Sequence, residues 1–376
     1  MSHATSLAPP TATLPPRSEL VRAYLAGDES YEGIFITAVR TTGIFCRPAC
    51  PARKPKPQNV EFYSTAQEAL FAGFRPCKRC RPMEPAGASP EWLAPLLRGV
   101  ESDPTRRWRN QDLRELGLDP ARVARWFMKH HNMTFHAYSR SRRLAAALSH
   151  IQQGDQVTTA AFDAGYESVS AFNDAFRKFA GSAPRASQNA PVAHVDRIAT
   201  PLGAMVAASI GEELVLFEFA DRRMLPTQFE RLARRFGCVC APGGNSRVLQ
   251  QLRRELDRYF AGKLRDFGVP LRVKGTPFQE SVWNALLRIP CGVTRSYADI
   301  AREIGRPTAV RAVARANGDN HICILIPCHR VIGSDGTLTG YGGGLWRKQR
   351  LLEVEHATAV AAGAGSRIIQ TSLAIR

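Results

Sequence analysis

Four cysteines in two close pairs limit the fold of this chain more than any other feature. Three residues separate Cys46 from Cys50, two separate Cys77 from Cys80, and 26 lie between the pairs. Each pair is short enough for two sulfurs to reach one ion, and the gap fits a loop or hairpin. The spacing therefore predicts one tetrahedral zinc site, with an iron–sulfur centre as the alternative. On spacing alone, a purely structural zinc site is favoured.

The segment around these cysteines is strongly basic. Residues 40–82 hold nine basic side chains against Glu61 and Glu68, a local net charge of +7, and the whole chain carries +18. Such a surface attracts nucleic-acid phosphates, and we expect Arg47 to contact DNA. The nine basic residues are Arg40, Arg47, Arg53, Lys54, Lys56, Arg75, Lys78, Arg79 and Arg81.

Length and hydropathy limit the remaining choices. A chain of 376 residues is too long for one compact core and predicts several domains. It has no apolar run of about 18 residues and no signal-peptide pattern, so we expect no membrane span and a cytoplasmic location. Its nine cysteines should then be reduced, which favours metal binding or catalysis over disulfides.

The cysteine segment resembles a known family. The strings RTTGIFCRPAC, ending at Cys50, and GFRPCKRC, ending at Cys80, are similar to the N-terminal module of the bacterial Ada family. The resemblance implies zinc as the metal and Cys46 as the acceptor of a methyl group from a DNA methylphosphotriester. Four thiolates on zinc leave a charge of −2, which methylation changes to −1. We expect this change to strengthen operator binding by weakening repulsion from DNA.

Two helix–turn–helix patterns follow, at residues 112–127 and 158–179. Asp119-Pro120 opens a helix in the first pattern, and residues 165–168 form the turn of the second. Phe172, Phe176 and Phe179 are spaced as core positions of the last helix. The expected DNA-facing residues on that helix are Ser170, Asn173, Asp174 and Arg177.

The string from Ala164 to Pro184 resembles the signature of the AraC family of transcription regulators. The resemblance implies sequence-specific DNA binding, and Arg140, Arg142 and Arg143 lie where that family has basic residues on its connecting helix. The chain departs from the family at Asp174, where a basic side chain is common, and its first helix–turn–helix is about one residue short. These departures leave the operator sequence open.

A second candidate nucleophile lies in the segment IPCHRV, residues 326–331. Cys328 is followed by His329, and an adjacent histidine can supply thiolate character. A buried, inert cysteine is the alternative that four letters alone favour. Cys291 occurs in a similar IPC segment without the His-Arg pair, so we interpret it as structural, like Cys238, Cys240 and Cys323.

Residues 275–355 resemble the O6-alkylguanine-DNA alkyltransferase family along their whole length. The resemblance implies that Cys328 accepts the alkyl group, that His329 acts as its base through a water, and that Glu355 polarises the histidine. It also implies a loop, Tyr341 to Gly344, that closes over the base, with Gly342 where a hydroxyl residue is common. Three further roles are implied: Tyr297 as proton donor to the departing guanine, Arg311 as the residue that enters the duplex, and Asn320 as the residue that pins the turn before the active-site strand.

We therefore expect a multi-domain α+β protein with a small zinc module, an all-α AraC-type helix–turn–helix domain and a two-lobed alkyltransferase domain. The expected boundaries are a disordered leader at 1–16, the zinc module at 17–82, the helix–turn–helix domain at 91–184, the alkyltransferase N-lobe at 193–272, its catalytic C-lobe at 273–356 and a flexible tail at 357–376.

The expected function combines repair with regulation. Each of two cysteines works once, because a thioether is stable: Cys328 on O6-methylguanine and O4-methylthymine, and Cys46 on methylphosphotriesters, the latter activating transcription. The expected partners are double-stranded DNA and RNA polymerase, and the expected state is a monomer. Three alternatives stay open: a regulator with structural zinc and vestigial repair sites, a repair enzyme without regulatory function, and a thiol redox sensor.

Overall fold

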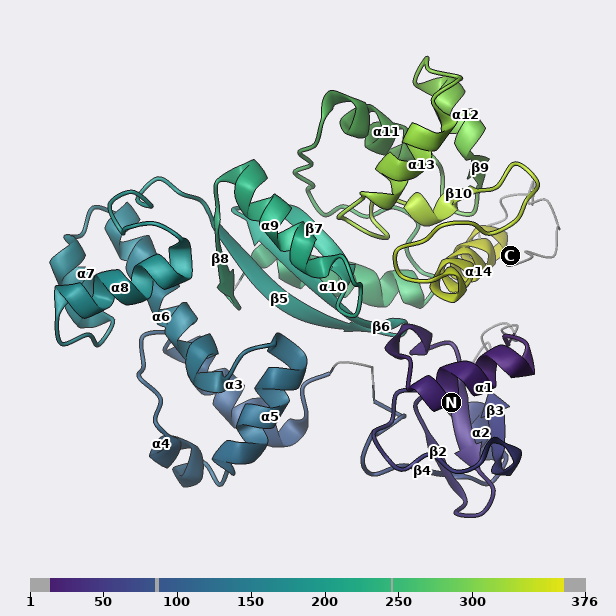
Figure 1. Ribbon diagram of the computed structural model, residues 1–376, viewed down its shortest axis with the longest axis horizontal. Helices are drawn as coiled ribbons and strands as arrows, with labels where there is room; N and C mark the ends of the chain where they lie inside the picture. Colours follow the sequence, from purple (N-terminus) through teal and green to yellow (C-terminus); the bar gives the residue numbers. More distant parts are fainter. Residues whose placement is uncertain (1–13, 85–87, 245, 362–376) are drawn as a thin grey trace, which may run out of the picture.

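The computed structural model describes residues 14–84, 88–244 and 246–361 (Figure 1). Most of the expected leader and tail lie outside these residues. Where the tail was expected to begin, however, helix α14 (Leu345–Ala361) continues for five residues beyond His356. The helix persists because Thr358 and Ala359 are buried against the rest of the chain. Within the described part of the chain, no helix is long and apolar enough to cross a membrane.

The zinc module is built on a four-stranded sheet of order β3-β1-β2-β4. Its central strand β1 is entirely buried and pairs antiparallel with β2 and β3, while β4 runs parallel to β2. Thr65 begins α2 by accepting a hydrogen bond from the Glu68 amide. The elements are α1 (Arg17–Ala26), η1 (Glu29–Tyr31), β1 (Ile36–Val39), β2 (Ile44–Cys46), η2 (Pro57–Asn59), β3 (Val60–Tyr63), α2 (Ala66–Phe71) and β4 (Arg75–Pro76).

The middle of the chain is helical, as predicted. The long helix α6 connects two small bundles that have separate hydrophobic cores (Figure 1). Phe172 and Phe176 are fully buried and Phe179 partly so, which confirms the spacing argument. The elements are η3 (Glu91–Leu93), α3 (Ala94–Ser102), α4 (Asn110–Glu115), α5 (Pro120–His131), α6 (Phe135–Gln152), α7 (Val157–Asp163) and α8 (Val169–Ala180).

The remaining residues form a sheet-bearing lobe followed by a helical lobe. The sheet has the order β7-β6-β5-β8, and α10 packs on it. Its elements are β5 (Val192–Thr200), β6 (Gly203–Ile210), β7 (Glu213–Phe219), α9 (Leu225–Phe236), β8 (Val239–Pro242) and α10 (Arg247–Phe260). The helical lobe comprises α11 (Pro277–Leu287), β9 (Arg295–Ser296), α12 (Tyr297–Glu303), α13 (Val310–Gly318), η4 (Cys328–Arg330), β10 (Val331–Ile332) and α14.

The zinc module and the two lobes share one hydrophobic core. Leu20 and Phe35 of the module belong to the same buried cluster as Leu202 of the sheet lobe and Leu351 of α14. Polar contacts reinforce this interface: the Trp346 indole donates to Glu19 over 2.9 Å. The structure packs the first module directly against the last helix, an arrangement that the sequence did not indicate (Figure 1).

Candidate metal centre and active site

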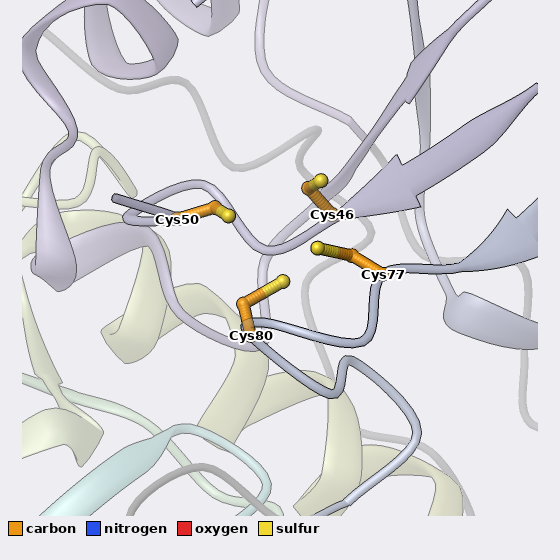
Figure 2. Close-up of side chains that lie close together, drawn as sticks. All are labelled: Cys46, Cys50, Cys77 and Cys80. Atoms are coloured by element: carbon orange, nitrogen blue, oxygen red, sulfur yellow. The ribbon is translucent and has the colours of Figure 1, made fainter. Parts of the chain in front are cut away.

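The pairing of β2 with β4 brings the four cysteines together. Cys46 ends β2, Cys77 follows β4, and the Cys77 amide donates to the Phe45 carbonyl over 3.0 Å. Figure 2 shows the four thiols pointing toward one another, and their sulfurs all lie within 4.8 Å of each other. Tetrahedral zinc with Zn–S bonds of about 2.3 Å needs sulfurs roughly 3.8 Å apart, so the cluster fits one zinc ion with little adjustment.

Arg47 is engaged inside the protein. Its Nε donates to the Cys80 carbonyl over 2.9 Å, its Nη1 pairs with Glu32 at 3.1 Å, and its Nη2 donates to the Arg81 carbonyl over 3.0 Å. Only 15% of its side chain is exposed. A DNA phosphate at Arg47 would have to displace these bonds, which the sequence did not indicate.

A small, mostly apolar pocket adjoins the sulfurs. Cys46, Cys50 and Cys77 line it together with Tyr24 and Lys54. The Lys54 ammonium donates to the Pro48 carbonyl over 2.7 Å and lies 4.8 Å from the centre of the Tyr24 ring. The pocket thus combines an apolar wall with a fixed positive charge beside the sulfurs.

Cys328 lies on the short 3₁₀ turn η4, whereas the family resemblance implied an active-site strand. The turn forms because the Arg330 amide bonds back to the Pro327 carbonyl over 2.9 Å. The Cys328 side chain is buried, and Asn320 Nδ2 donates to its sulfur over 3.1 Å and to the Ile326 carbonyl over 2.9 Å. Hydrogen bonds from Cys323 and Asn320 lower the pKa of Cys328 against the opposing effect of burial. The sulfur is therefore poised toward the thiolate.

His329 and Glu355 form a buried pair next to this turn. His329 Nε2 lies 2.8 Å from Glu355 Oε1, and neither side chain is exposed. Burial alone would raise the pKa of Glu355, but His329 and Arg330 together hold it well below its ordinary value. Burial lowers the pKa of His329, so the ring is neutral at pH 7. Because an ionised carboxylate only accepts, we assign the ring proton to Nε2, which leaves a lone pair on Nδ1.

The charge of Glu355 is fully compensated. Arg330 donates to it from Nε and Nη2, each over 2.8 Å, and the Tyr259 hydroxyl donates over 3.0 Å. His329 Nδ1, by contrast, is buried and has no hydrogen-bond partner among the described residues. The site therefore offers one basic nitrogen that the surrounding protein leaves available.

Tyr297 and Arg311 lie at the edges of this buried set. The Tyr297 hydroxyl donates to the Thr339 carbonyl over 3.3 Å, next to Gly340 of the pocket beside Cys328, and burial raises its pKa. Arg311 is exposed at the start of α13. The structure thus brings together Cys328, Asn320, His329 and Glu355, and leaves Arg311 on the surface.

Four stretches of the chain match known families. Residues 19–83 match the "Metal binding domain of Ada" and 113–190 a "Helix-turn-helix domain". Residues 197–273 and 277–357 match the "ribonuclease-like domain" and the "DNA binding domain" of 6-O-methylguanine DNA methyltransferase. The "Bifunctional transcriptional activator/DNA repair enzyme Ada" of Escherichia coli K12 is 35% identical over 342 residues, covering 89% of this chain and 95% of that protein.

The chain belongs to the Ada family. The "Regulatory protein ada" of Salmonella typhimurium is 34% identical over 88% of this chain and 94% of that protein. A solved structure, of Mycobacterium tuberculosis OGT in complex with DNA, is 42% identical, covers 44% of this chain and 94% of that one, and has a TM-score of 0.39. Family membership and the cysteine cluster agree on one zinc ion, as the spacing predicts.

In this Ada-family chain, the side of α8 that is predicted to face DNA is largely exposed to solvent. Ser170 and Arg177 are exposed and Asn173 is half-buried. Arg177 lies 3.8 Å from Asp174, whose charge offsets its own. Contact of these residues with DNA stays a prediction.

All three arginines lie on the connecting helix α6, as the resemblance implies, and two of them have internal partners. Arg143 Nη1 donates to the Ala164 carbonyl over 2.8 Å, and Arg142 Nη1 donates to the Pro242 carbonyl over 3.3 Å. Both side chains are buried, and only Arg140 is exposed. These arginines therefore fasten α6 to the second bundle and to β8.

Sequence reasoning missed a polar cluster behind Cys328. Glu218 of β7 is completely buried, pairs with Arg222, and lies 3.1 Å from the Cys323 sulfur. Cys323, interpreted as an inert core residue, lines the same pocket as Cys328. The available signal was an acidic residue inside an apolar strand with an arginine four positions later, since a buried acid requires a partner.

Proposed function

We propose that this chain is a single-use DNA methyltransferase with two acceptors, Cys328 and Cys46, and that the second acceptor controls transcription. The observation that carries the proposal is the buried Cys328 site, in which an activated sulfur adjoins a neutral histidine held by an ionised carboxylate. A purely structural core would gain nothing from such costly buried charges.

The reaction at Cys328 is a displacement at carbon. The thiol proton passes to His329 Nδ1 through one water, and Glu355 stabilises the imidazolium that forms. The sulfur attacks the alkyl carbon, the S–C bond forms as the C–O6 bond breaks, and the electron pair stays on guanine. Tyr297 supplies a proton to this anion. The thioether is stable and the residues around it offer no hydrolytic route, so the site turns over once.

The lesion must leave the duplex to reach this site. Extrusion of a nucleotide costs a few kcal/mol, because stacking and pairing are lost. Arg311 is exposed at the start of α13, and its insertion into the duplex would fill the gap. O6-methylguanine and O4-methylthymine both present an alkyl carbon on an exocyclic oxygen, so both are proposed substrates.

The zinc site is the second proposed acceptor. Zinc, when bound, keeps its four thiols ionised at neutral pH. Of these, Cys46 is the proposed methyl acceptor because its flanking sequence resembles that of the family's acceptor, while Cys50, Cys77 and Cys80 complete the coordination. Lys54 beside the pocket would hold the backbone of a methylphosphotriester, whose own charge the methyl group has removed.

The proposed partners follow from these roles. Double-stranded DNA is the substrate and the operator, read by Ser170, Asn173 and Arg177 of α8 and, after rearrangement, by Arg47. Transcriptional activation implies contact with RNA polymerase, and the chain is proposed to act in the cytoplasm as a monomer. The domain boundaries expected from the sequence are retained as part of this proposal, except that α14 extends the last domain to Ala361.

Paired serine variants test the proposal on two DNA substrates. Cys328→Ser should abolish loss of methyl from O6-methylguanine and spare loss from methylphosphotriesters, and Cys46→Ser should do the reverse. Cys291→Ser is the matched control, because it alters a similar IPC segment and should leave both activities intact. Equal losses in both acceptor variants would contradict two independent acceptors.

A further inference from the structure

Arg222 brings a positive charge into the Cys328 pocket from the other lobe. It lies three residues after the end of β7, and its side chain is only 7% exposed. It lines the pocket together with Cys328, Tyr341 and Gly342. None of the roles implied by the family resemblance uses this residue.

The guanidinium is held in a fixed position. Its Nη1 donates to the Asn320 carbonyl over 3.2 Å, its Nη2 donates to the Gly318 carbonyl over 2.6 Å, and Glu218 pairs with it from behind. Glu218 is itself fixed by the Phe219 amide, which donates over 2.9 Å. A charge fixed in this way stabilises a developing anion without reorganising during the reaction.

Gly342 makes room for this guanidinium. A Cβ at position 342 would lie 2.5 Å from Arg222 Cζ and 2.6 Å from its Nε, closer than real contacts allow. The arginine head therefore fills the space that a side chain at position 342 would enter. The resemblance places Gly342 where a hydroxyl residue is common, and here the Arg222 guanidinium from the facing lobe occupies the space that such a side chain would need.

We propose that Arg222 is a catalytic residue that contacts the O6 side of the extruded guanine and stabilises the negative charge formed as the alkyl group leaves. This inference rests on the proposed function of Cys328. The S–C bond forms as the C–O6 bond breaks, and the electron pair of the broken bond stays on the purine. The Arg222 guanidinium stabilises the resulting negative charge. Arg222 keeps its own proton, so the anion is protonated by Tyr297 as before.

The alternative is an ion pair with Glu218 that serves only to join the lobes. A variant in which both partners become neutral separates the two roles, because it leaves no buried charge unpaired. In full-length, zinc-loaded Glu218→Gln/Arg222→Met protein, single-turnover methyl transfer from duplex O6-methylguanine to Cys328 should fall by about 10²–10³-fold, the usual cost of losing one oxyanion donor. Reaction of Cys328 with iodoacetamide, which has no purine leaving group, should stay within about threefold of wild type.

Position 342 supplies a second, independent arm. In the native chain, Gly342→Ala should displace the guanidinium and slow methyl transfer at least about tenfold. In the neutral double variant, Gly342→Ser should restore at least about tenfold, because its hydroxyl can then donate in place of the arginine. Methyl transfer to Cys46 reports in every variant that the chain is folded.

Three results would overturn the inference: methyl transfer by the neutral variant within threefold of wild type, an equal fall in the iodoacetamide reaction, or unchanged transfer by Gly342→Ala. Failure of the wild-type chain to methylate Cys328 at all would instead refute the proposed function. The two failures are therefore distinguishable.

Discussion

At the scale of single residues, the activity proposed for Cys328 depends on Glu355, a carboxylate that acts through His329. Glu355 fixes the tautomer of His329 and neutralises the buried Arg330. The sequence placed His329 and Glu355 in one site only through family resemblance, since they are 26 positions apart. The pairing of Glu218 with Arg222 could have been inferred from an acid inside an apolar strand, but nothing in the sequence indicated the contact of Glu218 with Cys323.

Replacement of Glu355 tests this dependence. In Glu355→Gln the amide no longer stabilises an imidazolium, so methyl transfer at Cys328 should slow by about 10²-fold or more. Arg330 loses its compensating charge, and the free energy of unfolding should fall by about 3 kcal/mol. Single-turnover kinetics and urea unfolding measure the two effects. Glu353→Gln, two residues earlier on α14 in a partly exposed pair with Arg350, is the control and should change stability by less than about 1 kcal/mol.

The pH dependence of transfer follows from the lowered pKa of Cys328. An ordinary thiol, with a pKa of about 8.5, loses about tenfold in thiolate for each pH unit below that value. Hydrogen bonds to the Cys328 sulfur favour the thiolate. As the pH is lowered, the rate of methyl transfer should therefore begin to fall at a lower pH than the thiolate fraction of free cysteine does. The lowered pKa of His329 keeps the base neutral at pH 7. A transfer profile that coincides with the titration of free cysteine would contradict this account.

At the scale of elements, local sequence patterns predicted the helices and the metal site. They predicted almost none of the contacts between segments that are distant in sequence. The helices of the central region were predictable because Phe172 and Phe176 repeat at helical spacing, and the metal site because its cysteines are close in sequence. The packing of the zinc module on α14 was not predictable, since the contact residues Glu19 and Trp346 lie at opposite ends of the chain.

Gly33 gives a test of this interface. It has a φ of +79°, and a Cβ there would lie 1.9 Å from the Pro201 carbonyl oxygen. Gly33→Ala should therefore lower the free energy of unfolding by more than about 2 kcal/mol, from backbone strain and from separation of the module from the sheet lobe. Gly43→Ala is the matched control, because φ is +66° with open space around it, and it should cost only about 1 kcal/mol. Equal costs would argue against a tightly packed interface.

At the scale of the whole molecule, one chain with a net charge of +18 contains two separate sulfur sites. The zinc site is held by four thiols and the Cys328 site by hydrogen bonds and a buried ion pair, so the two sites should depend on different conditions. The zinc module and the two lobes nevertheless share a hydrophobic core, so unfolding of the zinc module should lower the stability of the lobes.

Zinc removal tests this combination. A chelator should abolish methyl transfer to Cys46, because thiols that lose the metal take up protons. Transfer to Cys328 should persist below the melting temperature, while the melting temperature itself should fall as the zinc module loosens against α14. Calorimetry together with transfer assays on both substrates measures these effects. Parallel loss of both transfers at low temperature would contradict separate activation of the two sulfurs.

The most direct test is peptide mapping by mass spectrometry after incubation with a duplex that carries a single O6-methylguanine. The account predicts one methyl group per chain, on Cys328. A methyl group on the neighbouring Cys323, or on no cysteine, would contradict it.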